Sequence, residues 1–403
     1  MAISAHALVA CGPSLDADDD GVVDAREADA MPDGPPPEPT RLGPGEGETP
    51  FGFGHAMAAS GDTLVVGATQ APVRIGAVYV FVRRGRAWER QAKLVGAPGA
   101  AAFGERVAIG GDTLAVSERL AGAAPNGEGV MRVRVYTRSG ASWSEAAVLE
   151  PAVAHDGFAA ALAIEGDTIV VGDGGRTQAN QHVDAGARVY VREGASWTER
   201  ATLVPAGAAP SWAYASAVAL DGDRLVVGDH SATSPAGDIT GQAYVFERVA
   251  GAWQHAATLA PRFVNVWPHD VDFGVDVALR GDRLVVATDD SCPEALVFER
   301  SGAAWNEVAA LDPDHNVCGR STPRVAIGDD VVVVAAPGIE DDDGPFDIEG
   351  AGYIFRRSDG AWSEMPERVV AENATSTGSS VVLTEDELLL GAPRWGAVYI
   401  HAR

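Results

Sequence analysis

Seven degenerate repeats run along the sequence, and this periodicity constrains the fold more than any other feature. A Gly-Asp turn followed by an apolar run recurs at Gly61-Asp62, Gly111-Asp112, Gly166-Asp167, Gly222-Asp223, Gly281-Asp282 and Gly328-Asp329, with a variant at Glu385-Asp386. Successive aspartates lie 47 to 59 residues apart, which is enough for four short strands and their connections. Because such a unit cannot bury its apolar faces alone, the repeats must pack against one another.

Each repeat predicts four strands, which we call A to D. Strand A begins with an aromatic residue and a small one, as in Phe53-Gly54, and strand B is an apolar run such as 63–68. The lack of alternation in that run predicts burial on both faces. Strand C follows at 77–81 in the first repeat. Strand D alternates with a period of two, which is typical of an outer strand with one wet face; it opens at Trp88, Trp143, Trp197, Trp253, Trp305 and Trp362.

The two ends of the chain predict how the repeats close. The seventh repeat ends at Arg403 after strand C, whereas residues 39–45 resemble residues 93–99 at the end of the first strand D. The N-terminal segment therefore supplies the missing strand D, which removes an open sheet edge. We predict an all-β fold over residues 39–403, a seven-bladed β-propeller of four-stranded antiparallel blades closed by an N-terminal strand.

The combination of Phe-Gly, Gly-Asp-Thr-Leu-Val-Val-Gly-Ala and Gly-Ala-Val-Tyr-Val-Phe in residues 53–81 resembles the FG-GAP repeat of integrin α-subunit propellers and bacterial surface proteins. The resemblance implies an extracytoplasmic location. Many FG-GAP repeats carry a calcium loop between strands A and B, but here that place holds only the Gly-Asp turn. Integrin-like metal sites are therefore not expected in the blades. The acidic string 341–347 is either a solvated loop or a cation site.

The first 38 residues are predicted to lie outside the propeller. Residues 1–11 end in Leu8-Val9-Ala10-Cys11, which resembles the lipobox of bacterial lipoproteins and implies lipidation of Cys11. The alternative is a small-residue N-terminus without a signal function. Residues 12–38 are rich in Pro, Gly, Asp and Glu and indicate a tether. We therefore predict a cell-surface or outer-membrane lipoprotein, or a secreted protein, that meets the membrane only through this anchor.

An acidic loop in the tether matches the spacing of an EF-hand calcium site. The positions of an EF-hand loop are occupied by Asp16, Asp18, Asp20, Val22, Asp24 and Glu27, with Gly21 at the sharp turn. The carboxylates and the carbonyl of Val22 would coordinate Ca²⁺, the one cofactor that the sequence suggests. A disordered acidic spacer is the alternative.

The charge of the chain limits its partners. The formal net charge is −27, which would repel nucleic-acid phosphates and anionic membrane surfaces. We therefore expect no nucleic-acid partner.

In a propeller the B–C and D–A connections share one face, and here they are long and variable, whereas the A–B turns are short and uniform. Long loops on a rigid scaffold commonly carry binding residues. The aromatic and histidine candidates for ligand binding in these loops are Trp212, Trp267, Trp395, His182, His230 and His269. Their alternatives are tryptophans that fill the gaps between blades and ordinary polar loop residues.

The two remaining cysteines, Cys292 and Cys318, fall in neighbouring connections of the same face. They predict either a disulfide, in an oxidising compartment, or two free thiols.

No catalytic motif stands out. We expect a recognition or adhesion module that binds a protein or a glycan, and not an enzyme. The alternatives are an enzyme acting on extracellular polysaccharide through loop carboxylates and histidines, and a structural envelope protein without a small ligand.

Overall fold

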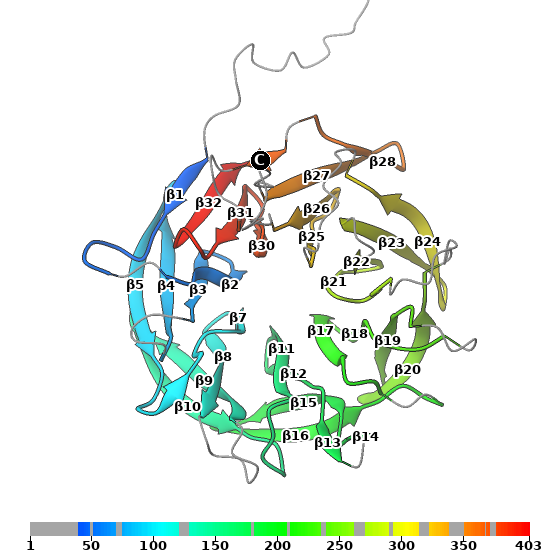
Figure 1. Cartoon of the computed structure of the whole chain (residues 1–403), viewed down its shortest axis with the longest axis horizontal. Coiled ribbons are helices and arrows are strands. Elements are labelled where there is room, and N and C mark those ends of the chain that lie inside the picture. Colours follow the sequence, from blue (N-terminus) through cyan, green and yellow to red (C-terminus); the bar gives the residue numbers. More distant parts are fainter. Residues whose placement is uncertain are drawn as a thin grey trace, which may run out of the picture. The chain divides into compact units, whose positions relative to one another are not determined.

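The strands form seven antiparallel blades around a central axis (Figure 1). The computed structural model describes residues 39–48, 51–69, 75–120, 129–178, 181–207, 210–234, 239–261, 271–289, 293–313, 322–337, 350–366, 368–370 and 376–403. These residues form strands and turns, with no helix among them. Each blade has four strand positions, A to D, from the axis outward, so the predicted seven-bladed propeller is confirmed. The predicted leader and tether, 1–38, lie outside the described residues.

The blades are numbered 1 to 7 from β2. Position A holds β2 (Phe53–Ser60), β7 (Val107–Gly110), β11 (Phe158–Glu165), β17 (Tyr214–Asp221), β21 (Val277–Arg280), β25 (Arg324–Ile327) and β30 (Ser380–Leu383). Position B holds β3 (Thr63–Ala68), β8 (Thr113–Leu120), β12 (Thr168–Asp173), β18 (Arg224–Asp229), β22 (Arg283–Asp289), β26 (Val331–Ala336) and β31 (Glu387–Ala392).

The outer half of each blade follows the same order. Position C holds β4 (Ala77–Arg84), β9 (Val130–Ser139), β15 (Gly186–Glu193), β19 (Gln242–Val249), β23 (Pro293–Ser301), β27 (Ala351–Ser358) and β32 (Ala397–Ala402). Position D holds β5 (Ala87–Val95), β10 (Ser142–Leu149), β16 (Ser196–Leu203), β20 (Ala252–Leu259), β24 (Ala304–Leu311), β28 (Ala361–Glu364) and β1 (Thr40–Leu42).

Four short strands supplement this plan. In blade 2, β6 (Ala100–Ala101) pairs with β8 and extends position A. In blade 6, β29 (Val369–Val370) pairs with β27 and extends position D. A hairpin of β13 (Arg176–Gln178) and β14 (Gln181–Val183) stands between strands B and C of blade 3.

The ring is closed by pairing between the two ends of the propeller. Strand β1 pairs antiparallel with β32 in the register Thr40↔Ile400, Arg41↔Tyr399 and Leu42↔Val398. The last blade therefore takes strands A to C from the end of the chain and strand D from its beginning, as predicted. In Figure 1 the blue β1 lies beside the red β32.

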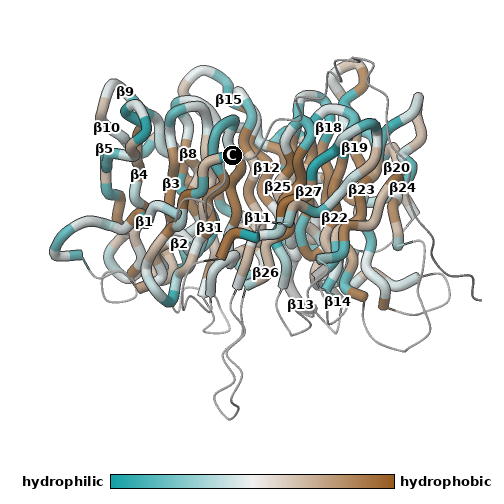
Figure 2. Tube along the Cα trace, turned by 90° about the horizontal axis from the view of Figure 1, so that it is seen from above, coloured by the Kyte–Doolittle hydropathy of each residue, from teal (hydrophilic) through white to brown (hydrophobic). Residues whose placement is uncertain are grey.

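The hydrophobic core consists of seven clusters among the described residues, each shared by two neighbouring blades. Every residue of β3 and β26 is buried, as the unbroken apolar runs predict. Across the closure, Leu64 of blade 1 packs in one cluster with Leu389 of blade 7. Figure 2 shows this apolar material in the middle of the strands and hydrophilic residues toward both ends of the ring.

Glycines let neighbouring blades approach closely. A Cβ at Gly67 in strand B of blade 1 would lie 2.1 Å from the carbonyl oxygen of Gly104 in blade 2. A Cβ at Gly391 in blade 7 would lie 2.0 Å from the carbonyl oxygen of Gly54 in blade 1. Both distances are too short for any side chain, which explains the repeated glycine near the end of strand B.

We call the end of the ring formed by the A–B and C–D turns the turn face, and the opposite end the loop face. On the turn face an arginine amide of strand C donates to the carbonyl of the turn aspartate in every blade, at 2.8 to 2.9 Å. In blade 6 Arg357 donates to Asp330 and not to Asp329. The turn predicted at Gly328-Asp329 is therefore centred one residue later.

The same arginines pair with the strand-D tryptophans. Each of six tryptophans lies opposite the strand-C arginine that precedes it by five residues in the sequence. The pairs are Arg83↔Trp88, Arg138↔Trp143, Arg192↔Trp197, Arg248↔Trp253, Arg300↔Trp305 and Arg357↔Trp362. In the first four pairs the guanidinium carbon lies 5.0 to 5.5 Å from the ring centroid, within the range of a cation–π interaction.

Candidate functional site

The loop face carries the three predicted ligand-binding residues whose side chains the structure describes. Trp212 precedes strand β17, His230 follows strand β18, and Trp395 lies in the turn between β31 and β32. His182 lies in β14, where it pairs in register with Thr177.

The remaining predicted site residues lie outside the described part of the chain. They are Trp267, His269, Cys292, Cys318, the lipidation residue Cys11, and the calcium-loop residues Asp16, Asp18, Asp20, Val22, Asp24 and Glu27. These assignments stay predictions.

Trp212 and His230 lie together. Their rings meet edge to face with centroids 5.3 Å apart, and 59% of the Trp212 surface is exposed. The Nδ1 atom of His230 is 3.1 Å from the hydroxyl oxygen of Ser216. Ser211 holds the loop that carries Trp212, because its amide and hydroxyl both donate to the buried carboxylate of Asp229. The tryptophan is therefore presented by a fixed loop.

Trp395 forms a separate exposed site in blade 7, three blades from blade 4. Its side chain is 47% exposed, and the side chain of Arg41 donates to its backbone carbonyl at 3.2 Å. Phe51 is also exposed, and the amide of the adjacent Gly52 donates to the carbonyl of Pro393. The structure therefore separates Trp395 from the Trp212–His230 pair.

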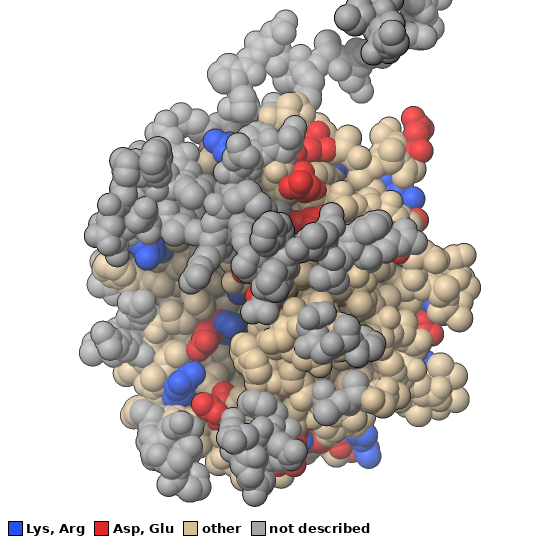
Figure 3. All heavy atoms as spheres, turned by 45° about the vertical axis from the view of Figure 1, so that its right-hand side comes forward, with Lys and Arg blue, Asp and Glu red and all other residues tan. Residues whose placement is uncertain are grey.

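A pocket of about 370 Å³ lies at the centre of the ring, lined by residues of all seven blades. Its walls come from the first half of the A strands, as far as their middle, and from the residues just before the shorter A strands, so the pocket extends from the loop-face end to the middle of these strands. We call it the channel pocket. Its polar groups include His55, Glu105, Arg106, Ser216, Asp276 and Arg324. On the face drawn in Figure 3, charged side chains of opposite sign lie close to one another.

Arg106 is anchored within the channel pocket. Its Nε donates to the carbonyl of Ala160 at 2.9 Å, and one terminal nitrogen donates to the carbonyl of Glu105 at 3.0 Å. The same nitrogen lies 3.8 Å from the Glu105 carboxylate. About a third of the side chain, 37%, remains exposed, so Arg106 is fixed in place and still accessible.

Asp276 and Arg324 come from neighbouring blades. The Asp276 carboxylate accepts a hydrogen bond from the Val325 amide at 2.9 Å. Burial raises the pKa of Asp276, and the charge of Arg324 opposes that shift. Among the described residues, the Arg324 side chain has neither a hydrogen bond nor an ion pair. A guanidinium offers five N–H donors, so Arg324 is available to a ligand.

The two histidines near the pocket favour the neutral form. Burial lowers the pKa of His55, and the charges of Arg106 and Arg324 lower it further. Burial also lowers the pKa of His230, against the attraction of Asp229. At neutral pH both rings therefore donate and accept hydrogen bonds without adding charge.

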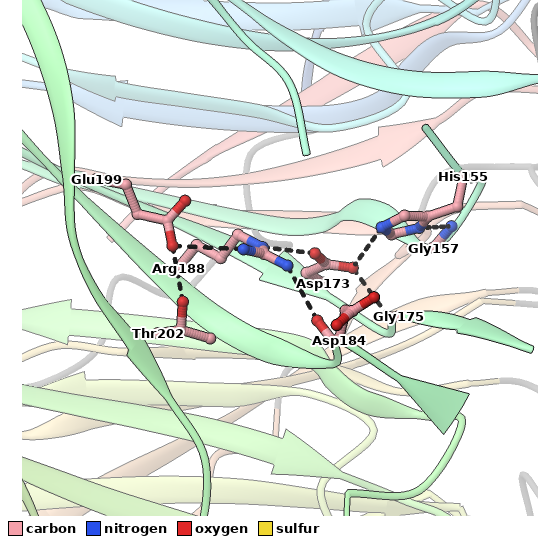
Figure 4. Close-up of polar contacts among 8 residues, drawn as sticks. All are labelled: His155, Gly157, Asp173, Gly175, Asp184, Arg188, Glu199 and Thr202. Atoms are coloured by element: carbon pink, nitrogen blue, oxygen red, sulfur yellow. Dashed lines mark hydrogen bonds and ion pairs between the residues drawn. The ribbon is translucent and has the colours of Figure 1, made fainter. Parts of the chain in front are cut away.

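A buried network in blade 3 binds a further histidine, His155 (Figure 4). His155 is 6% exposed, and its Nε2 lies 3.5 Å from the carboxylate of Asp173. The same carboxylate accepts hydrogen bonds from Gly175 N at 2.9 Å and from Arg188 Nε at 2.6 Å. Arg188 also contacts Glu199 at 3.3 Å. His155, Asp173 and Arg188 are buried, so these hydrogen bonds anchor the loops of blade 3.

Sequence reasoning missed that three adjacent blades place a buried acid at the end of strand B. These residues are Glu118, Asp173 and Asp229, each fully buried. Glu118 accepts from the Ala97 amide at 2.7 Å, much as Asp229 accepts from Ser211. The sequence signal for these residues is an acidic residue at the end of an unbroken apolar run. A carboxylate buried there needs hydrogen-bond partners.

The described part of the chain contains no cluster of three His, Cys, Asp or Glu side chains with the geometry of a metal site. The described residues also contain no helix long and apolar enough to cross a bilayer.

Comparison with known proteins identifies the repeat. The FG-GAP repeat family matches residues 197–246, which run from strand D of blade 3 to strand C of blade 4. Among solved structures the chain is similar to U3-55K, at 14% identity and a TM-score of 0.46, over 73% of this chain and 76% of that one. No curated protein matches the chain. The chain is therefore a seven-bladed β-propeller in which one stretch matches the FG-GAP repeat, a repeat typical of extracellular and cell-surface recognition and adhesion modules.

Proposed function

We propose that this propeller is an extracytoplasmic recognition module that binds a protein or a glycan through its loop face, and that a lipid on Cys11 anchors it to the membrane. One observation carries the binding proposal. Trp212 is 59% exposed and stands beside His230, which contacts a residue lining the channel pocket. An exposed, rigidly held aromatic side chain beside a polar hollow is a common basis for recognition.

The distribution of exposed apolar side chains supports the same face. Trp212, Trp395 and Phe51 are among the most exposed large hydrophobic residues, and all three lie in B–C or D–A connections. Tryptophan is enriched among the residues that contribute most to binding where proteins contact partners.

The proposal is tested with the full chain and Trp212→Ala on arrays of glycans and of extracellular matrix proteins. We expect at least one ligand whose binding falls tenfold or more in the variant, because a buried tryptophan contact contributes about 2 kcal/mol or more. Val249→Ala is the matched control, since Val249 is 52% exposed at a C–D turn of the turn face. Equal binding by Trp212→Ala and the wild type to every ligand would contradict the proposal.

A polysaccharide-cleaving enzyme is the second candidate, favoured by one observation. Two acidic residues from different blades, Glu105 and Asp276, line the channel pocket. Glycoside hydrolysis uses two carboxyl groups, one of them with a raised pKa, and the pKa of Asp276 is raised by burial. Turnover of a polysaccharide panel that disappears in Asp276→Asn would establish this activity; binding without turnover supports the recognition module.

A further inference from the structure

We propose that the channel pocket binds the carboxylate of an acidic sugar and that Arg324 is the group that recognises it. This inference rests on the proposed function and names its ligand class. Arg324 lines the pocket at the start of β25, and its side chain has no hydrogen-bond or ion-pair partner among the described residues. A guanidinium is shaped for two parallel hydrogen bonds to a carboxylate.

Arginines elsewhere in the propeller show why Arg324 differs. On the turn face, Arg280 donates to Asp329 at 2.6 Å and Arg138 donates to Asp112 at 2.6 Å. Within blade 3, Arg188 donates to the buried Asp173. These guanidinium groups already hold an acid of the protein. Arg324 makes no such hydrogen bond or ion pair among the described residues, although its charge acts on the nearby Asp276, so its N–H donors are open to a ligand carboxylate.

The remaining lining selects a sugar over a more highly charged anion. Glu105 and Asp276 line the same pocket, and their negative charge would repel a phosphate monoester with two negative charges more strongly than a single carboxylate. The same carboxylates are strong acceptors for hydroxyl groups. A mixed lining of acids, arginines and neutral histidines therefore fits one carboxylate surrounded by hydroxyls, which is the chemistry of a uronic acid.

Trp212 extends the site beyond the pocket. Its ring contacts His230, and His230 contacts Ser216 in the pocket wall. A pocket of about 370 Å³ is at the small end for ligand sites. The sugar in the pocket would thus be followed by a second ring at the rim, where the exposed face of Trp212 can stack on it.

The test uses isothermal titration calorimetry of the full chain with trigalacturonic acid and with its methyl ester, which has the same rings without the charges. We expect the acid to bind about 10- to 100-fold more tightly than the ester, the range of a charge-assisted hydrogen bond. Arg324→Gln should abolish this preference, and Arg324→Lys should retain part of it. The matched control is Arg280→Gln, which removes an arginine from the turn face and should leave the preference intact.

The outcomes separate this inference from the proposed function. If acid and ester bind equally, with Trp212 required for both, the recognition module stands and the carboxylate assignment is overturned. If a peptide with a C-terminal carboxylate binds through Arg324 and trigalacturonic acid does not, the sugar assignment is overturned. A preference for the acid that survives in Arg324→Gln, with the variant's unfolding midpoint unchanged, overturns the role of Arg324.

Discussion

The two faces of the ring both carry arginine and acidic residues, but these residues have different roles on each face. On the turn face, the carbonyl of the turn aspartate accepts a strand-C amide in every blade, and the arginine side chains mostly reach acids of the same or the next blade. On the loop face each blade differs, and the hollow at its centre contains an arginine without a protein partner among the described residues.

The difference between the faces shows which residues must recur in every repeat and which can differ from blade to blade. Interactions repeated in seven blades hold the ring together, because each blade contacts only its neighbours. The loop face needs no such uniformity and can present one asymmetric site. The turn face is therefore structural, and the loop face is the proposed binding face.

The largest loss of stability should come from a loop-face residue that is structural. Asp173→Ala removes the fully buried partner of Arg188 and His155. Arg188 would then keep only the partly exposed Glu199 as a countercharge, which should lower the free energy of unfolding by about 3 kcal/mol, as measured by urea denaturation. Asp156→Ala, which alters an exposed aspartate beside His155, should be nearly neutral. Equal effects of the two variants would refute the structural assignment.

Close approach of the blades predicts the next effect. Gly67→Ala would place a methyl group 2.1 Å from the Gly104 carbonyl oxygen, and this overpacking should cost about 1 to 3 kcal/mol. Gly43→Ala is the control, because nothing lies within 4 Å of a Cβ there. A Gly67→Ala protein as stable as the wild type would show that the blades are not in such close contact.

The ring closure predicts a smaller effect on the turn face. Arg83 pairs with Asp386 at 2.7 Å and with Glu387, both in blade 7, and it covers the ring of Trp88. Arg83→Gln should lower the unfolding free energy by about 1 to 2 kcal/mol, since the pairs are partly exposed. Arg86→Gln, at an exposed position of the same turn, should change it by less than about 0.5 kcal/mol. Similar losses in both variants would count against the pairing.

The smallest expected effect is a pH dependence from the channel pocket. The pKa of His55 is lowered by burial and by nearby arginines, so the unfolded chain binds its proton at a higher pH than the folded chain. Stability should therefore fall as pH drops below about 6.5. Asp276, whose pKa is raised, acts in the opposite direction at lower pH. The contribution of His55 is measured as the difference between the wild type and His55→Gln in how the free energy of unfolding depends on pH. Parallel pH profiles of the two proteins would contradict it.

The fold could be predicted from the sequence because its signals are repeated. The Gly-Asp turns, the apolar runs and the tryptophans recur at a fixed order, and the missing final strand points to closure by residues near Thr40. The position of the turn at Asp330 was not predicted, because the preceding Gly328-Asp329 matches the repeat pattern. The arginine five residues before each strand-D tryptophan is a second repeated signal in the sequence.

The site was less predictable, for a physical reason. Trp212 and His230 could be placed on the loop face from loop length, but their contact depends on how Ser211 binds Asp229. The channel pocket collects residues from the first half of the A strands, where the repeats carry unrelated residues such as His55 and Arg324. Without a shared spacing, only the closed ring brings them together.

The most direct test of this account measures stability and binding in the same pair of variants, Arg83→Gln on the turn face and Arg324→Gln in the channel pocket. Urea denaturation and titration with trigalacturonic acid are carried out on both. The account predicts that Arg83→Gln loses stability and keeps its affinity, while Arg324→Gln keeps its stability and loses affinity about tenfold or more. Lower stability of Arg324→Gln with unchanged affinity, or loss of affinity by a folded Arg83→Gln, would contradict the division between the two faces.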